Sequence, residues 1–202
     1  MGNKRVLIAC EFSGIVREAF RKVGCDAYSC DLLPTEIPSE HHIQEDVLKH
    51  LEDGWDMMIA FPPCTHLSVS GACWFTNGKK DRRLQEDALD FVRKLMDAPI
   101  DKIAIENPVS VISTRIRKPN QIVNPYFFGH PVPKRTCLWL KNLPLLQPTN
   151  MVEPEVIIGK RDGKKYSKVH YYTQRSPDRW KIRSRTFQGF ADAMAEQWGK
   201  IL

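Results

Sequence analysis

The sequence predicts an α/β fold in which a mostly parallel sheet is covered by helices on both faces. Short apolar runs of strand length alternate along the chain with amphipathic segments of helical period. The apolar runs are nearly continuous, as expected for strands that are buried on both faces. At 202 residues the chain has the length of one domain, and we expect residues 1–202 to form it.

The first half of the chain contains three expected strands. Residues 5–10 (RVLIAC) form an apolar run, and residues 14–23 follow with their apolar side chains on one helical face. Residues 26–30 predict a second strand, and residues 46–51 predict a short helix or turn. The apolar run at 57–61 (MMIAF) predicts a third strand. It stops at a Pro-Pro pair, because proline cannot continue a ladder of backbone hydrogen bonds.

The second half continues the alternation. Residues 81–96 carry apolar side chains at helical spacing and predict an amphipathic helix. Residues 102–105 predict a strand that ends at Glu-Asn-Pro, and residues 136–140 predict another strand. Residues 187–202 predict a closing helix.

Composition narrows the class of protein. The chain is 42% hydrophobic and 27% charged, which is typical of globular proteins and excludes whole-chain disorder. No apolar run approaches the ~18 residues of a membrane-spanning helix, and the first residues lack the pattern of a signal peptide. We therefore expect a cytoplasmic protein whose six cysteines are reduced thiols.

Positive charge is concentrated late in the chain. The net charge is +6, and residues 159–185 hold ten Lys and Arg against two Asp, with tyrosines and a tryptophan between them. Basic groups neutralise phosphates and aromatic rings stack on bases, so this segment predicts a nucleic-acid surface, although it could also be a solvated basic face. The residues expected to contact nucleic acid are Lys160, Arg161, Lys164, Lys165, Lys168, Arg175, Arg179 and Lys181.

Polar residues follow several of the predicted strands, and ligands bind beyond the carboxyl ends of such strands. Gly14 opens the first helix and allows a close approach of the backbone to a ligand. Asp31 is placed to bind ribose hydroxyls, and Asp46 to accept from an adenine amino group. These positions predict a pocket for a nucleoside cofactor, while each residue alone could also serve as a turn or cap.

Cys64 and Glu106 follow neighbouring predicted strands. Cys64 comes directly after the Pro-Pro pair, and Glu106 begins the Glu-Asn-Pro sequence. A thiolate beside an acid is a pair suited to covalent catalysis. The alternatives are a buried structural thiol for Cys64 and a salt bridge or cap for Glu106.

These motifs resemble those of the cytosine-C5 DNA methyltransferases, which use S-adenosylmethionine. The motifs follow the same order over nearly the whole chain. The length of the chain is similar to that of the short methyltransferase-like proteins of phages and prophages. The motifs that carry it are Glu11-Phe12-x-Gly14, Asp31, Asp46, Pro62-Pro63-Cys64, Glu106-Asn107, Lys134-Arg135 and Arg185-Thr186-Phe187-Gln188-Gly189-Phe190. It implies a Rossmann-like methyltransferase fold and a location in the cytoplasm of a bacterial host.

The resemblance also implies a role for each site residue. Cys64 would add to C6 of cytosine, Glu106 would hold N3 and the exocyclic amine, and Arg135 would support the base. The target base would have to leave the duplex stack to reach them. The residues that would bind the cofactor are Glu11, Phe12, Ser13, Gly14, Asp31, Leu32, Asp46, Val47 and Pro62.

The enzymes of this family usually carry a target-recognition domain between the arginine motif and the closing motifs. In this chain that interval is residues 145–181, which is too short for such a domain. We expect a compact basic hairpin or loop there, low sequence specificity and salt-dependent binding. Alternatives remain open: the same chemistry on RNA or a free pyrimidine nucleotide, or a non-catalytic protein that binds the cofactor and nucleic acid. The reduced arginine motif, with Pro133 and Cys137 in place of Gln and Arg, favours the last. No metal is expected, since the histidines lack ligand spacing.

Overall fold

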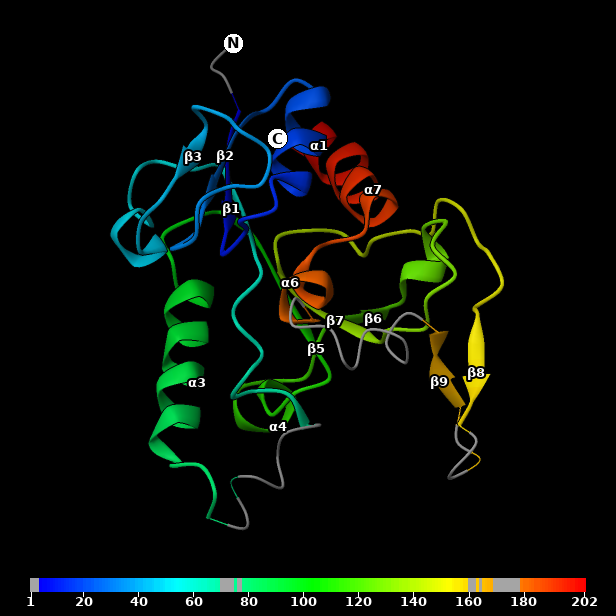
Figure 1. The fold of residues 1–202 in the computed structure, drawn as a ribbon. Helices are drawn as coiled ribbons and strands as arrows, with labels where there is room; N and C mark the ends of the chain where they lie inside the picture. Colours follow the sequence, from blue (N-terminus) through cyan, green and yellow to red (C-terminus); the bar gives the residue numbers. More distant parts are fainter. Residues whose placement is uncertain (1–3, 70–74, 76–77, 160–162, 164, 169–178) are drawn as a thin grey trace.

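The computed structural model describes residues 4–69, 75, 78–159, 163, 165–168 and 179–202. A seven-stranded sheet in the order β3-β2-β1-β4-β5-β7-β6 runs through the molecule (Figure 1). The pairs from β3 to β5 are parallel, whereas β7 is antiparallel to both β5 and β6. The strands are β1 (Arg5–Ala9), β2 (Asp26–Cys30), β3 (His42–Ile43), β4 (Met57–Ala60), β5 (Lys102–Pro108), β6 (Gln121–Val123) and β7 (Thr136–Lys141).

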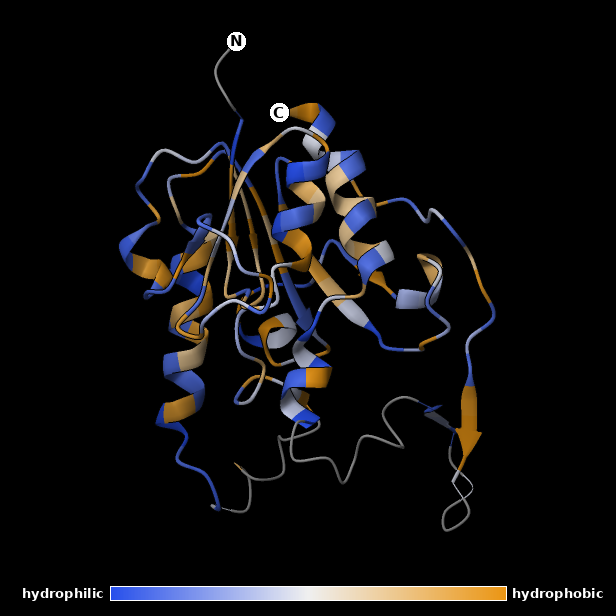
Figure 2. Cartoon of the chain, turned by 45° about the horizontal axis from the view of Figure 1, so that its top comes forward, coloured by the Kyte–Doolittle hydropathy of each residue, from blue (hydrophilic) through white to orange (hydrophobic). Residues whose placement is uncertain are grey.

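Helices cover both faces of the sheet, so the predicted α/β class is confirmed. Helices α1 (Ile15–Lys22) and α7 (Gln188–Trp198) pack on one face, and α3 (Arg83–Met96) packs on the other. Figure 2 shows apolar strands between helices whose outer surfaces are hydrophilic. Shorter helical segments are η1 (Val47–Lys49), α4 (Ile112–Arg115), η3 (Pro125–Phe127), α6 (Arg179–Ser184) and η5 (Gly199–Ile201).

Most predicted elements lie within two residues of their observed bounds, but several short ones were not predicted. Strands β3 and β6 have two and three residues, too few for a hydrophobic period to show. The helix expected over 187–202 ends at Trp198 and continues as the 3₁₀ turn η5. The strand expected over 102–105 continues to Pro108, because β7 pairs with it along that whole length.

The basic stretch contains a two-stranded antiparallel hairpin of β8 (Val156–Ile158) and β9 (Lys165–Ser167). It lies to one side of the main sheet in Figure 1. Of the residues expected to contact nucleic acid, Lys160, Arg161, Lys164 and Arg175 lie outside the described residues. Among the helices that the structure describes, none is long and apolar enough to cross a membrane.

A buried arginine holds α1 against the loop that follows β2. The side chain of Arg17 is fully buried and donates to the Ser29 hydroxyl at 2.8 Å and to the Ile37 carbonyl at 2.8 Å. Gly14, at the start of α1, has φ +77°, and a Cβ there would lie 2.7 Å from the Arg17 guanidinium. Glycine thus serves both the left-handed backbone and the close approach of this guanidinium.

We expect Arg17→Ala to lower the free energy of unfolding by about 3 kcal/mol, because it leaves buried acceptors unpaired and opens a cavity. The matched control is Arg21→Ala on the same helix. Arg21 is partly exposed and lies 3.9 Å from Asp26, so we expect a loss of about 0.5 kcal/mol. Urea unfolding of both variants checks this prediction, and equal losses would contradict it.

Candidate functional site

The site lies at the carboxyl edge of the parallel strands, where β4 ends and β5 continues. Ala60, the last residue of β4, pairs with Ile105, so Glu106 has no neighbour on that side of the ladder. The chain after β4 turns away at Pro62, whose carbonyl accepts a hydrogen bond of 2.8 Å from Nδ2 of the buried Asn107. This bond ties the Pro-Pro-Cys turn to β5 and brings Cys64 to the level of Glu106.

Cys64, Glu106 and Lys134 interact electrostatically. Burial raises the pKa of the Glu106 carboxyl, while Lys134 and a hydrogen bond from Thr136 oppose that rise. The Cys64 side chain reaches the surface, yet desolvation raises the pKa of its thiol, and Glu106 raises it further. Lys134 and Arg183 lower the pKa of the same thiol. The thiol and the acid are therefore close enough for each to affect a common ligand.

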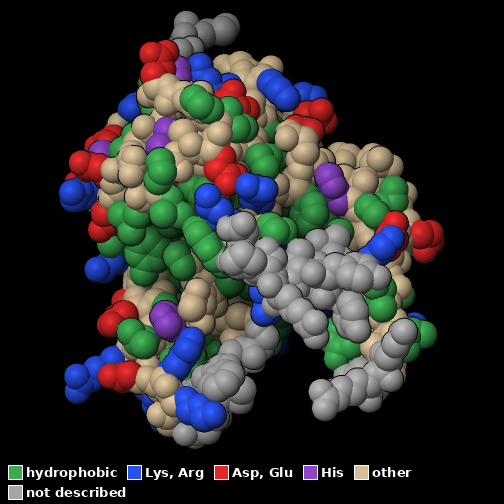
Figure 3. Space-filling view, in the orientation of Figure 1, with side chains coloured by type: hydrophobic (Ala, Val, Ile, Leu, Met, Phe, Trp, Pro, Cys, Tyr) green, Lys and Arg blue, Asp and Glu red, His purple; other side chains and the backbone are tan. Residues whose placement is uncertain are grey.

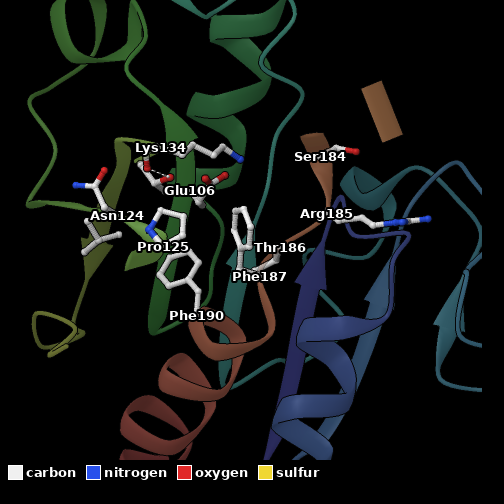
Figure 4. Close-up of a pocket in the computed structure, with 11 residues that line it drawn as sticks. Glu106, Asn124, Pro125, Lys134, Ser184, Arg185, Thr186, Phe187 and Phe190 are labelled. Atoms are coloured by element: carbon white, nitrogen blue, oxygen red, sulfur yellow. Dashed lines mark hydrogen bonds between the residues drawn. The ribbon is translucent and has the colours of Figure 1, made fainter. Parts of the chain in front are cut away.

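A hollow opens beside Glu106 on the α7 face of the sheet (Figure 4). Figure 4 shows the Lys134 side chain extending over Glu106, with the rings of Phe187, Pro125 and Phe190 opposite. The residues that line it are Glu106, Val123, Asn124, Pro125, Lys134, Thr136, Ser184, Arg185, Thr186, Phe187 and Phe190. The hollow therefore has aromatic and proline rings on one side and polar groups, Glu106, Lys134 and Thr136, on the other.

The structure places Lys134, and not Arg135, in this hollow. Lys134 and Thr136 both line it, two residues apart. Arg135 is exposed and faces Cys137, where it opposes the rise that burial causes in the pKa of that thiol. Side chains alternate across an extended strand, so only one of the two neighbouring cations can face Glu106. Lys134 lies two residues before Thr136, a spacing that predicts the same side of an extended segment for both. The resemblance to the family's arginine motif pointed instead to Arg135.

A second cluster of polar groups surrounds the turn after β1. Glu11 is buried; its Oε1 accepts from the Ser13 hydroxyl at 2.5 Å and from the Val16 backbone at 3.3 Å. Burial raises the pKa of Glu11, and the bond from Ser13 opposes this rise. Oε2 of Glu11 has no hydrogen-bond partner in the described part of the chain. A buried oxygen of this kind is suited to accept from a ligand donor beside Gly14.

The predicted cofactor residues beyond β2 and β3 gather near the same turn. Asp31 accepts from the Leu33 backbone at 2.9 Å, and Asp46 caps η1 by accepting from Leu48 at 3.0 Å. Both carboxylates raise the pKa of Cys10, whose main perturbation is burial. Both carboxylates therefore have local structural partners, and both lie close enough to Cys10 to act on its thiol. Of the other predicted residues, Phe12, Val47 and Pro62 are buried and Leu32 is 72% exposed.

Helix α6 crosses the site and joins its two sides. Arg185, just after α6, donates two hydrogen bonds to the Glu36 carboxylate, of 2.8 and 2.7 Å. The rings of Phe12 and Trp180 have centroids 6.1 Å apart. On the other side, Lys134 Nζ donates to the Arg183 carbonyl at 3.2 Å. In Figure 3, Lys and Arg side chains lie beside an acidic one near the middle of the face that α6 crosses in Figure 1.

The remaining basic candidates lie on the hairpin and on α6. Lys165 and Lys168 are exposed, and Lys168 forms an ion pair of 2.8 Å with Glu155. Arg179 is exposed, and Lys181 lies 3.8 Å from Glu36. Within the described residues, no three His, Cys, Asp or Glu side chains are arranged to hold a metal ion. The five cysteines that the structure describes are free thiols.

Similarity to known proteins is found among solved structures. No family model matches the chain, and no curated protein matches it. A protein encoded within an E. coli prophage, described as a candidate DNA modification methyltransferase, is similar in structure, with a TM-score of 0.47 and 16% sequence identity. The match covers 74% of this chain and 52% of that one, so this chain spans about half the length of that structure.

We expect Glu106→Gln to shift the alkylation of Cys64 to lower pH. Iodoacetamide reacts with the thiolate, and the Glu106 carboxylate is the largest cause, after desolvation, of the raised pKa of Cys64. Removal of that negative charge lowers the pKa of the thiol and raises its thiolate fraction at a given pH. Lys134→Gln removes a positive charge and shifts the profile to higher pH. Peptide mass spectrometry measures both profiles, and shifts in the same direction would contradict this account.

Proposed function

We propose that this chain transfers a methyl group from S-adenosylmethionine to C5 of cytosine in DNA, with Cys64 as the nucleophile. The observation that carries the proposal is the meeting of Cys64, Glu106 and Lys134 at one strand edge, next to the polar cluster of Glu11 and Asp31. A thiol beside an acid meets the requirement of an electron-poor ring that reacts at C5 only after a nucleophile has added at C6.

The side chains divide the chemistry among them. The Cys64 thiolate adds to C6 of the cytosine, and Glu106, whose raised pKa favours the protonated form, supplies a proton or hydrogen bond to N3. Electron density then moves to C5. After C5 is methylated, its proton leaves to a base, the C5–C6 double bond reforms and Cys64 departs as a thiolate. Lys134 stabilises the thiolate before attack and after expulsion.

The residues at the second cluster fit a nucleoside cofactor. Within the described residues Oε2 of Glu11 has no partner and is available to a donor, and Asp31 and Asp46 are suited to hydroxyl and amino groups. When bound, S-adenosylmethionine supplies an electrophilic methyl group. Phe12 and Trp180 close one side of this space.

A polymer substrate is favoured by the charge distribution. The basic residues of the hairpin, Lys165 and Lys168, are exposed and do not line the base-binding hollow, and phosphate contacts with a polymer account for charge of this kind. DNA is the substrate we propose, and with few base-reading elements the expected sequence specificity is low. RNA remains the competing polymer.

We expect incubation with tritiated S-adenosylmethionine and unmethylated DNA to place label in 5-methylcytosine after digestion to nucleosides. Cys64→Ala should reduce this label by at least ~10³-fold, because the adduct can no longer form. Calorimetry with S-adenosylhomocysteine is the control, and the variant should bind it as the unmodified protein does.

An oligonucleotide with 5-fluorocytosine gives a second readout. It has no C5 proton to lose, so Cys64 should remain attached, and the complex should survive a denaturing gel. Label in another nucleoside, or methylation that persists in Cys64→Ala, would contradict the proposal. Binding of cofactor and DNA without any label would favour the non-catalytic alternative, which the reduced arginine motif supports.

A further inference from the structure

Helix α6 has two basic faces, and one of them is anchored. Lys181 and Arg185 lie four residues apart and therefore on the same side of the helical turn. Both reach Glu36 in the loop after β2, at 3.8 Å from Lys181 and 2.7 Å from Arg185. The hydrogen bonds from Arg185 lower the pKa of Glu36. This face of α6 is fixed to the side of the site that holds the second polar cluster.

The other face turns toward Cys64. Arg179 and Arg183 are also four residues apart, and each lies two positions, about 200° of helical rotation, from a residue of the anchored face. Partial burial and the charge of Arg179 lower the pKa of Arg183, whereas Cys64 raises it. Lys134 approaches the same point, since its Nζ donates to the Arg183 carbonyl at 3.2 Å.

Lys134 lowers the pKa of Glu106, but none of the three cations forms an ion pair with a carboxylate in the described part of the chain. Among the residues that the structure describes, no carboxylate oxygen lies within 4 Å of the charged nitrogens of Lys134, Arg179 or Arg183. Like charges held close together repel each other, so an anion that entered between them would be favoured. Lys134 lines the hollow that contains Glu106, and its hydrogen bond to the Arg183 carbonyl joins α6 to that side of the hollow.

We propose that Lys134, Arg179 and Arg183 form a subsite for one phosphodiester of the substrate strand, next to the base that Cys64 attacks. The inference rests on the proposed function in one respect, that the substrate is a nucleic acid. A base that enters the hollow remains attached to its sugar and flanking phosphates, so one of these groups reaches the rim. Arginine binds phosphate with two parallel hydrogen bonds, and lysine acts as a compact charge.

A carboxylate of the cofactor is the other anion that could meet these cations. The phosphodiester is favoured because the polar cluster assigned to the cofactor contacts the opposite, anchored side of α6. Glu36, which holds that side, donates its backbone N–H to the Phe12 carbonyl at 2.9 Å. Arg183, on the other side of α6, interacts electrostatically with Cys64, and its carbonyl accepts a hydrogen bond of 3.2 Å from Lys134 in the hollow.

The test measures the affinity of a fluorescein-labelled single-stranded 12-mer as a function of KCl by fluorescence anisotropy. Arg179→Gln and Arg183→Gln should each weaken binding about tenfold at low salt and reduce the slope of log K against log [KCl] by about 0.7. The double variant should lose about 1.4 from the slope. The matched control is Lys94→Gln, an exposed lysine near the C-terminal end of α3, which should leave the slope unchanged.

Inorganic pyrophosphate should compete with the oligonucleotide on the unmodified protein and compete more weakly on the double variant. Unchanged slopes in Arg179→Gln and Arg183→Gln would overturn the proposal. So would a loss of S-adenosylhomocysteine affinity without a change in slope, because the cluster would then hold the cofactor. The assay needs no methyl transfer, so its failure and a failure of the Cys64 chemistry are distinguishable.

Discussion

The site depends on the common register of the parallel strands. Ala9 of β1 pairs with both Cys30 and Ala60, and Ala60 pairs with Ile105. Four strands from distant parts of the sequence therefore reach the same level at the carboxyl edge. The residues that come next along each strand meet there because of this register, and a slip of one residue in any pair would turn their side chains to the opposite face.

The antiparallel strand β7 adds a second constraint. It pairs with β5 through Pro108, beyond the last residue of β4, and so holds Glu106 in extended backbone where one neighbour is missing. The space that β4 leaves is filled on one side by the Pro62 turn and remains open on the other as the hollow. Lys134 and Thr136 enter that hollow because they precede and begin the antiparallel partner of β5.

Several ionisable groups near the site have pKa values that disfavour their charged forms. Burial raises the pKa values of Glu11 and Glu106, and desolvation raises that of Cys64, so each group is disfavoured in its charged form. Groups of this kind cost stability unless they are paired, and they concentrate where a ligand supplies the missing partner. Helix α6 pairs Lys181 and Arg185 with Glu36, whereas Arg179 and Arg183 form no ion pair with a carboxylate among the residues that the structure describes.

The sequence by itself determined the fold class, most of the strands and helices, and the positions of Cys64, Glu106, Asp31 and Asp46 at strand ends. These features are local, because a hydrophobic period, a Pro-Pro stop or a turn residue acts over a few neighbouring positions.

Only the tertiary structure decided that β7 runs antiparallel, that Lys134 and not Arg135 faces Glu106, and that Arg185 pairs with Glu36 across 149 residues of sequence. The direction of a strand and the partner of a side chain depend on packing between segments far apart in the chain, and no local pattern encodes which of them will meet.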